Sequence, residues 1–102
     1  MIIRVSEAGA VAIEDHDLFT GFHVDAPVGH TAEDIAAVLG EGTRADDRHH
    51  VWIAADAVRH WVADLATQEW EEGFTAMVDY ARGRGWMDES GTHIRAHLEH
   101  DG

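Results

Sequence analysis

Hydrophobic and polar residues alternate with a period of two in several short stretches of the chain, a pattern typical of half-buried β-strands. Residues 1–6 alternate in this way, and residues 10–14 do so again after a turn candidate at positions 7–9. A third alternating stretch covers residues 18–25. Because turn-forming residues separate the three stretches, we expect them to form a three-stranded antiparallel meander.

A helical period replaces the alternation after residue 30. Thr31 is a good N-cap, and two acidic residues follow it in what would be the first turn. Ile35, Val38 and Leu39 then lie at the spacing of a narrow apolar stripe. We expect a short helix here, followed by a polar loop over residues 43–48.

The segment from residue 49 to residue 86 holds all four tryptophans, so the core is expected to gather around it. A short strand at 49–53 leads into an apolar stripe of helical period over residues 54–82. The stripe nearly breaks at Thr67, which predicts either one kinked helix or two helices with Thr67 capping the second. Gly73 lies inside this pattern at a cost of about 1 kcal/mol, which indicates that another group packs closely there.

The last stretch, residues 92–100, alternates cleanly and is predicted to be a strand with one solvated or partner-facing side, at an edge of the sheet. The predicted order is therefore β-β-β-α-β-α-β. It indicates a single α+β domain over residues 1–102. We expect a mixed, mostly antiparallel sheet of about five strands, packed on one face by a short helix and one long helix that is straight, kinked or broken.

Charge changes the picture by excluding partners. Twenty acidic residues face seven arginines and no lysine, which gives a net charge of −13. Such a chain is repelled by phosphate backbones and anionic lipid surfaces, so neither nucleic acid nor membrane is an expected partner. No apolar run approaches the roughly 18 residues of a membrane span, and no secretory leader is recognisable, so we expect a cytoplasmic protein. The absence of cysteine excludes disulfides and thiolate zinc sites.

Asp56, His60 and Asp64 are spaced four residues apart and would share one face of the long helix. A histidine between two carboxylates is oriented and favoured in its protonated form, which suits general acid–base catalysis. The alternative is a solvated helix face supported by pairs of charged side chains.

His49 and His50 are adjacent, so on a strand their side chains point to opposite faces. One of them, with His60 or an aspartate of the preceding loop, is a candidate for a nitrogen and oxygen metal site. His93 and His97 share a face of the last strand, but about 13 Å separates them, too far for one ion. No metal ligand set is therefore assigned, and no cofactor is indicated.

Aromatic residues supply the third candidate site. A helix that presents aromatics to a sheet can line an apolar pocket for a small organic molecule, although such a stripe is more often simply core. The expected ligand-binding residues are Phe22, His23, Trp52, Trp61 and Trp70.

We therefore expect a small acidic domain that binds a small, mostly apolar organic molecule in a pocket between the long helix and the sheet. His49, His50, His60 and Asp56 are the candidate catalytic residues for acid–base chemistry of the isomerase, lyase or cyclase type. Whether the chain is an enzyme stays open. The first alternative is a non-catalytic assembly module, and the second is a histidine and aspartate metal-binding protein. We expect the chain to form a homodimer.

Overall fold

Six strands form one mixed sheet in the computed structural model, which describes residues 1–100. The α+β class and the mixed sheet are as predicted, with one strand more than expected. The strands are β1 (Ile2–Val5), β2 (Val11–Glu14), β3 (His23–Ala26), β4 (Thr43–Asp47), β5 (His50–Ala54) and β6 (His93–His100). The helices are α1 (Ala32–Leu39), α2 (Ala55–Trp61) and α3 (Gln68–Gly83).

The strand order is β2-β1-β3-β6-β5-β4. β1, β3 and β6 are parallel neighbours, while β2, β5 and β4 each run antiparallel to the strand beside them. The predicted meander is therefore wrong, because β3 pairs with β1 instead of β2. The prediction of β6 as an edge strand is also wrong, since it lies between β3 and β5.

Two segments differ from the predicted elements. Residues 18–22 do not continue β3; they form a loop in which Phe19 packs against α3 at Gly73 and Trp70, whereas Leu18 is exposed. Residues 43–47, predicted as loop, form the edge strand β4. An edge strand tolerates polar residues because one of its sides meets solvent.

The helix ends follow local chemistry. The Thr31 side chain accepts a hydrogen bond from the Asp34 N–H, and the Asp34 carboxylate accepts one from the Thr31 N–H, a reciprocal capping box. The predicted long helix is two helices, separated by a turn at residues 62–65. Thr67 caps the second by accepting from the Trp70 N–H at 3.0 Å.

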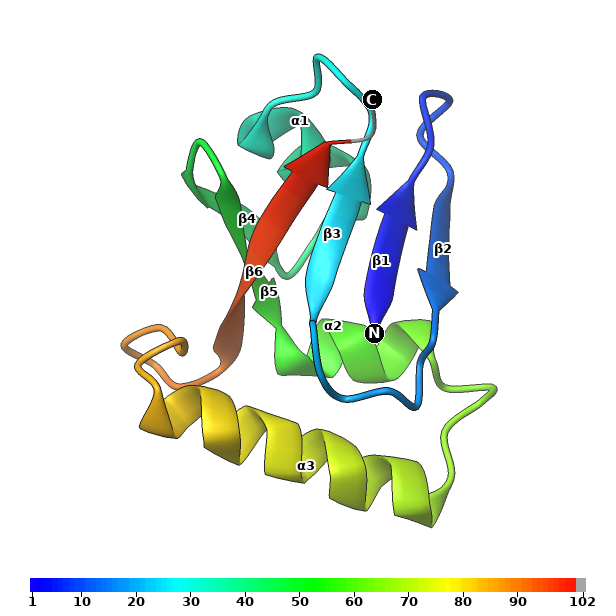
Figure 1. The fold of residues 1–102 in the computed structure, drawn as a ribbon, viewed down its shortest axis with the longest axis vertical. Helices are drawn as coiled ribbons and strands as arrows, with labels where there is room; N and C mark the ends of the chain where they lie inside the picture. The colour runs from blue at the N-terminus through cyan, green and yellow to red at the C-terminus, as the bar shows by residue number, and fades with distance from the viewer. Residues whose placement is uncertain (101–102) are drawn as a thin grey trace.

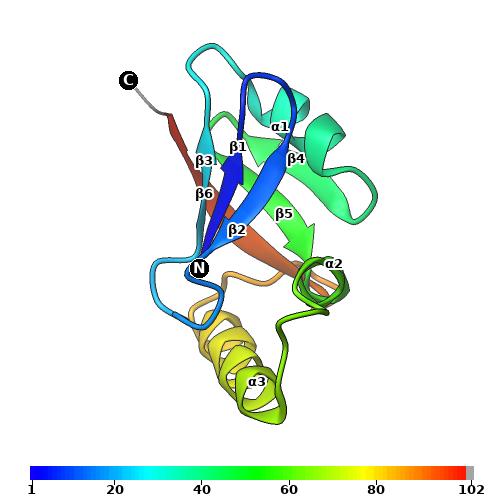
Figure 2. The same ribbon diagram turned by 90° about the vertical axis from the view of Figure 1, so that its right-hand side faces the viewer.

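Figures 1 and 2 show that α1 and α2 cover one face of the sheet, whereas α3 lies across its lower end. The opposite face, toward the viewer in Figure 1, carries no helix and is called the open face below. The covered face is aliphatic: Ile3, Val24, Val51 and Ile53 are fully buried there. No helix within residues 1–100 is both long and apolar enough to cross a membrane.

Gly73 allows α3 to approach the 18–22 loop. A Cβ at this position would lie 2.3 Å from the Phe19 ring, so only glycine leaves room for the aromatic side chain. The Phe19 ring in turn lies 6.0 Å from that of Trp70. This confirms the predicted close packing at Gly73 and fixes the position of the loop that forms one wall of the candidate site.

Candidate functional site

An apolar groove lies where α3 meets the end of the sheet. Its cavity volume is about 530 Å³, within the usual range for small-molecule sites. We call it the aromatic groove. Its walls come from the 19–22 loop, from the last turns of α3 and from the start of β6, and the lining residues are Phe19, Thr20, Gly21, Phe22, Met77, Tyr80, Ala81, Trp86, Ile94 and Arg95.

Aromatic side chains form the exposed rim of the aromatic groove. Tyr80 and Trp86 are both exposed, and their rings meet edge to face with centroids 5.9 Å apart. The Arg84 guanidinium lies over the Trp86 ring at 5.2 Å. The Trp86 backbone N–H donates to the Ala81 carbonyl, which returns the chain from the end of α3 toward the sheet. Trp86 is thus held by Tyr80, Arg84 and the backbone bond to Ala81, and it remains 41% exposed.

Asp88 fixes the loop that presents Trp86. Only 8% of its side chain is exposed. Although burial opposes ionisation, hydrogen bonds, that from Arg44 foremost, hold the pKa of Asp88 far below its ordinary value. The donors are the Arg44 guanidinium, the Ser90 hydroxyl and the backbone N–H groups of Thr92 and His93. This carboxylate ties the loop to β4.

A second, smaller cavity of about 240 Å³ opens beside the aromatic groove and is called the histidine cavity. Phe22, Trp86 and Arg95 line both cavities, and His50 and His97 complete the smaller one. The two histidines lie on neighbouring strands at paired positions, and their rings meet edge to face at 5.3 Å. Two imidazoles therefore stand next to the apolar groove.

Asp47 orients His50. Its carboxylate oxygen lies 2.9 Å from His50 Nδ1, and since a carboxylate only accepts, Nδ1 carries the proton. The His49 backbone N–H and then the His50 ring lower the pKa of Asp47 to about 2. Because Nδ1 is engaged by Asp47 and the His50 residue lines the histidine cavity, Nε2 is the ring nitrogen that can exchange a proton with a bound group.

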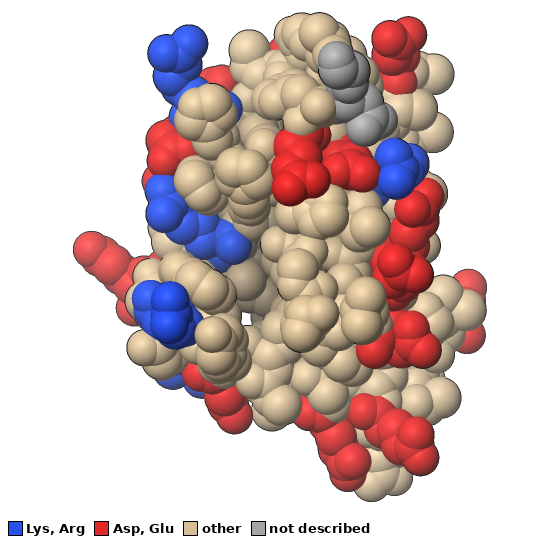
Figure 3. Space-filling model, viewed as in Figure 1, with Lys and Arg blue, Asp and Glu red and all other residues tan. Residues whose placement is uncertain are grey.

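Arg95 does not offer a free positive charge to either cavity. Its Nε donates to Asp46 at 2.7 Å and its Nη2 to Asp47 at 2.8 Å. Figure 3 shows charged side chains along the two sides of the open face and an acidic patch in the middle of its upper half, whereas the surface below that patch is largely uncharged and hollowed. A neutral, mostly apolar guest fits such walls better than an anion.

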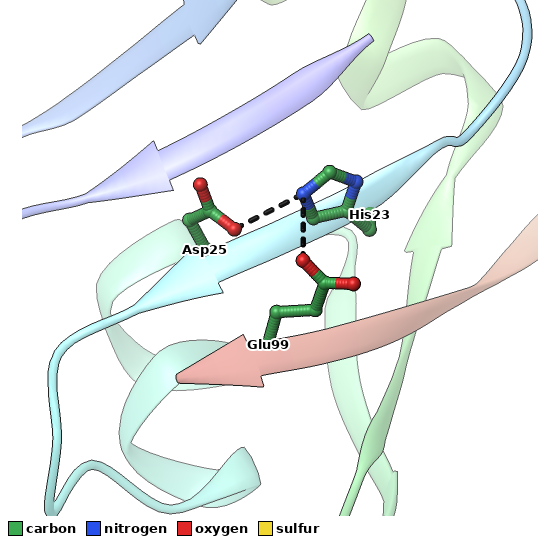
Figure 4. A group of neighbouring side chains, drawn as sticks. All are labelled: His23, Asp25 and Glu99. Carbon is green, nitrogen blue, oxygen red and sulfur yellow. Dashed lines mark hydrogen bonds and ion pairs between the residues drawn. The ribbon is translucent and has the colours of Figure 1, made fainter. Parts of the chain in front are cut away.

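A polar cluster lies higher on the open face, where β3 and β6 run side by side (Figure 4). His23 Nε2 lies 3.0 Å from Asp25 Oδ1 and 3.3 Å from Glu99 Oε2. The ligand atoms of the three side chains all lie within 4.8 Å of one another. We call these three residues the His23 cluster.

The structure brings two of the predicted site residues to the two cavities. Phe22 lines both, and His50 lines the histidine cavity. His23, predicted to bind the same ligand, belongs instead to the His23 cluster on the open face. The predicted pairing of aromatic and histidine walls is thus present, but it is built from other residues.

The three tryptophans predicted as ligand contacts lie elsewhere and far from one another. Trp52 is on the open face with the Arg44 guanidinium over its ring at 5.7 Å. Trp61 lines a shallow depression between α1, α2 and β2. Trp70 is buried, and its indole N–H donates to the His16 carbonyl at 2.7 Å.

The other predicted catalytic residues do not meet at either cavity. His49 is exposed in the turn between β4 and β5. Asp56 and His60 are exposed on α2, where Asp56 pairs with Arg59 at 3.0 Å. The predicted ladder of Asp56, His60 and Asp64 is incomplete, because Asp64 lies in the turn after the helix.

Tyr80 and Trp86 belong to the aromatic residues from which the sequence predicted a pocket, but neither they nor Arg95 and His97 were among the expected site residues. Met77, Tyr80 and Ala81 have helical spacing, which does signal a common face of α3. The His23 cluster had a signal as well: His-x-Asp at residues 23–25 and His-x-Glu at residues 97–99 repeat one pattern on two strands. What the pattern did not contain was the pairing of β3 with β6.

Comparison of the chain with protein-family models, with curated proteins and with solved structures found no match.

Proposed function

We propose that this domain binds a small, neutral, mostly apolar organic molecule in the aromatic groove and that His50 acts on it as an acid–base group. The observation that carries the proposal is the groove itself: an open apolar cavity of about 530 Å³ with exposed Tyr80 and Trp86 at its rim. Large aromatic side chains left in solvent at the mouth of a concave site favour a ligand that covers them.

Charge narrows the ligand class. The nearest cation at the floor, Arg95, is already bound by two aspartates. The chain as a whole carries −13, which repels anions at a distance. A ring-containing molecule without negative charge is therefore the favoured guest.

The acid–base part of the proposal rests on the Asp47–His50 pair. An ionised carboxylate that fixes one ring nitrogen leaves the other oriented for proton transfer. The histidine cavity that holds this ring adjoins the aromatic groove through Phe22, Trp86 and Arg95. A reacting group of a bound molecule would enter this smaller cavity. A His50→Gln variant should keep the binding of such a molecule and lose its turnover.

Thermal unfolding in the presence of small aromatic compounds, with indole and 2-naphthol as the first probes, tests the binding step. A compound present at 100 times its Kd should raise the melting temperature by roughly 10 °C. Trp86→Ala should weaken binding by about tenfold or more, since one stacked aromatic contact contributes roughly 1 kcal/mol or more. Trp52→Ala, a tryptophan on the open face, is the matched control and should bind as the wild type does.

A second copy of this chain is the second candidate partner, at a different surface. Val11 and Leu65 are exposed and, with Trp61, border an apolar depression of about 420 Å³. The depression adjoins β2, whose outer edge pairs with no strand among residues 1–100. An unpaired edge beside an apolar patch favours pairing with another copy.

The mass in solution tests this second candidate. Light scattering after size exclusion should give twice the chain mass of 11.3 kDa, and Val11→Asp should return the protein to a monomer. A monomer at all concentrations up to the millimolar range would exclude the dimer and leave the aromatic groove untouched.

A further inference from the structure

The His23 cluster is built by two parallel strands at the centre of the sheet. His23 and Asp25 alternate on β3, so they share the open face, and Glu99 does so on β6. The register pairs His23 with His97 and Asp25 with Glu99, which gives a square of four side chains that can ligate a metal. Their backbones are hydrogen-bonded on both sides, so the positions of the side chains are fixed by the sheet.

The spacing of the donor atoms fits a small divalent ion. His23 Nε2 stands 3.0 Å from Asp25 Oδ1 and 3.3 Å from Glu99 Oε2. A tetrahedral ion with ligand bonds of about 2.0–2.2 Å separates its donor atoms by about 3.3–3.6 Å. The two distances from His23 Nε2 are therefore within a few tenths of an ångström of those around an ion, and the Asp25 and Glu99 oxygens lie within 4.8 Å of each other.

The hydrogen bonds of His23 supply a second, independent observation. Its Nδ1 lies 2.7 Å from the Gly21 carbonyl oxygen, and because that oxygen only accepts, Nδ1 must donate. Its Nε2 faces two carboxylates, which also accept only. The ring thus has one nitrogen held by the backbone and the other directed at two carboxylate oxygens, which is the arrangement of a histidine and carboxylate ligand set.

The bond from Nδ1 to a backbone carbonyl is also the one that metal-binding histidines usually make with their second nitrogen. It fixes the ring and directs Nε2 at the carboxylates, as Figure 4 shows. The ring is largely enclosed, with 19% of the His23 side chain and 13% of the Asp25 side chain exposed, while Glu99 is 57% exposed. Glu99 thus closes a fixed pair from the solvent side.

Arg4 orients Asp25 without occupying the same oxygen. Its Nη2 lies 3.1 Å from Asp25 Oδ2, which leaves Oδ1 directed at His23. Arg4 is also held by Glu14 at 2.7 Å. Among residues 1–100, the carboxylates of Asp25, Glu99 and Glu14 and the Arg4 guanidinium carry a formal net charge of −2, which favours a cation at this place.

We propose that His23, Asp25 and Glu99 bind a divalent first-row transition ion such as Zn²⁺. An imidazole nitrogen with two carboxylate oxygens suits zinc, cobalt or nickel, whereas Mg²⁺ and Ca²⁺ prefer oxygen ligands alone. The site is distinct from the aromatic groove and does not depend on a guest in it.

Calorimetric titration of EDTA-treated full-length protein with zinc chloride at pH 7.5 tests the proposal. We expect one ion per chain that is lost or weakened at least about 100-fold in His23→Ala and about tenfold in Glu99→Gln, the usual scale for removing groups that hold a metal. Glu99 is more than half exposed, so Glu99→Gln keeps the fold even if His23→Ala does not. Circular dichroism verifies the fold of each variant.

Matched controls address the other histidines and acids of this chain. His60→Ala on α2 and Glu72→Gln on α3 change exposed residues away from the cluster and should bind zinc as the wild type does. Cobalt in place of zinc should give visible absorption bands that disappear in His23→Ala. Equal zinc affinity in wild type, His23→Ala and Glu99→Gln would overturn the proposal. No zinc binding by the wild type at millimolar concentration would also overturn it.

Discussion

The two faces of the sheet are made by the same strands but differ in the type and the burial of their side chains. Toward α1 and α2, alternate residues such as Val51 and Ile53 are aliphatic and fully buried. Toward the open face, the residues between them, such as His50 and Trp52, are polar or aromatic and half-buried. The covered face can stabilise the fold by burial alone, so the open face is free to hold groups that are costly to assemble.

That division explains where the candidate sites lie. Both the histidine cavity and the His23 cluster use open-face residues, and the aromatic groove forms where this face meets α3. Among residues 1–100 no polar or charged residue belongs to the buried core, although the Asp88 side chain in the loop after α3 is only 8% exposed.

The largest expected loss of stability comes from a substitution on the covered face, and a substitution on the open face of the same strand is its comparison. Ile53→Ala removes a fully buried side chain and should lower the free energy of unfolding by about 3 kcal/mol. His50→Ala, on the same strand but the open face, should change it by less than about 1 kcal/mol. Urea unfolding followed by tryptophan fluorescence measures both. Comparable losses would show that the open face contributes to the core.

Substitution of Asp88, whose side chain is enclosed in the loop after α3, should give the next largest loss in the free energy of unfolding. Asp88→Asn replaces a carboxylate that accepts hydrogen bonds from four groups, and it should lower the free energy of unfolding by about 2 kcal/mol. The folded pKa of Asp88 is below the unfolded value of about 3.9, so its stabilisation is present above that pH and is lost as the pH falls further.

Urea unfolding of wild type and Asp88→Asn between pH 7 and pH 2.5 measures this dependence. The difference between the two proteins should be full at pH 7 and should shrink below about pH 4. A difference that is the same at every pH would mean that the charge of Asp88 is not what holds the loop.

Gly73→Ala should have a smaller effect of mixed origin. Alanine favours a helix by about 1 kcal/mol over glycine, but its Cβ would displace the Phe19 ring, at a cost of about 2 kcal/mol. We expect a net loss of about 1 kcal/mol and weaker probe binding in the groove. Gly83→Ala, on the same helix with nothing within 4 Å of the added Cβ, is the control and should be neutral or stabilising.

The smallest effect is expected on α2. Asp56→Asn removes an exposed ion pair with Arg59 and should change stability by less than about 0.5 kcal/mol. Neither this variant nor His60→Gln should alter probe binding, since both residues are remote from the aromatic groove. A loss of binding in either variant would return the site to the predicted helix ladder.

Local features of the fold followed from local sequence. The Thr31 and Thr67 caps and the alternation of β6 each depend on a few neighbouring residues, and the pattern predicted them. The glycine at position 73 predicted a close contact, but not its partner Phe19, which lies far away in the sequence. The prediction erred where an alternating pattern had a different cause. Residues 18–22 have the alternation of a strand but form a loop in which Phe19 contacts α3. A period of two does not distinguish such a loop from a strand.

For the candidate sites, the sequence predicted the types of residue involved but not most of the individual residues. Aromatic and histidine walls were expected, and Phe22 and His50 supply part of them. Their partners Trp86 and His97 come from segments 36 or more residues further along the chain than His50. Which strands lie side by side depends on the total packing of the sheet, and alternation within one strand carries no information about its neighbours.

The four indole N–H signals of the protein provide the most direct test of ligand binding in the aromatic groove. Trp86 lines the groove, whereas Trp52, Trp61 and Trp70 lie outside it. In a proton–nitrogen correlation spectrum titrated with indole or 2-naphthol, we expect the Trp86 signal to move to saturation while the other three stay in place. A Trp86 signal that does not move, or four signals that move together, would contradict binding in the groove.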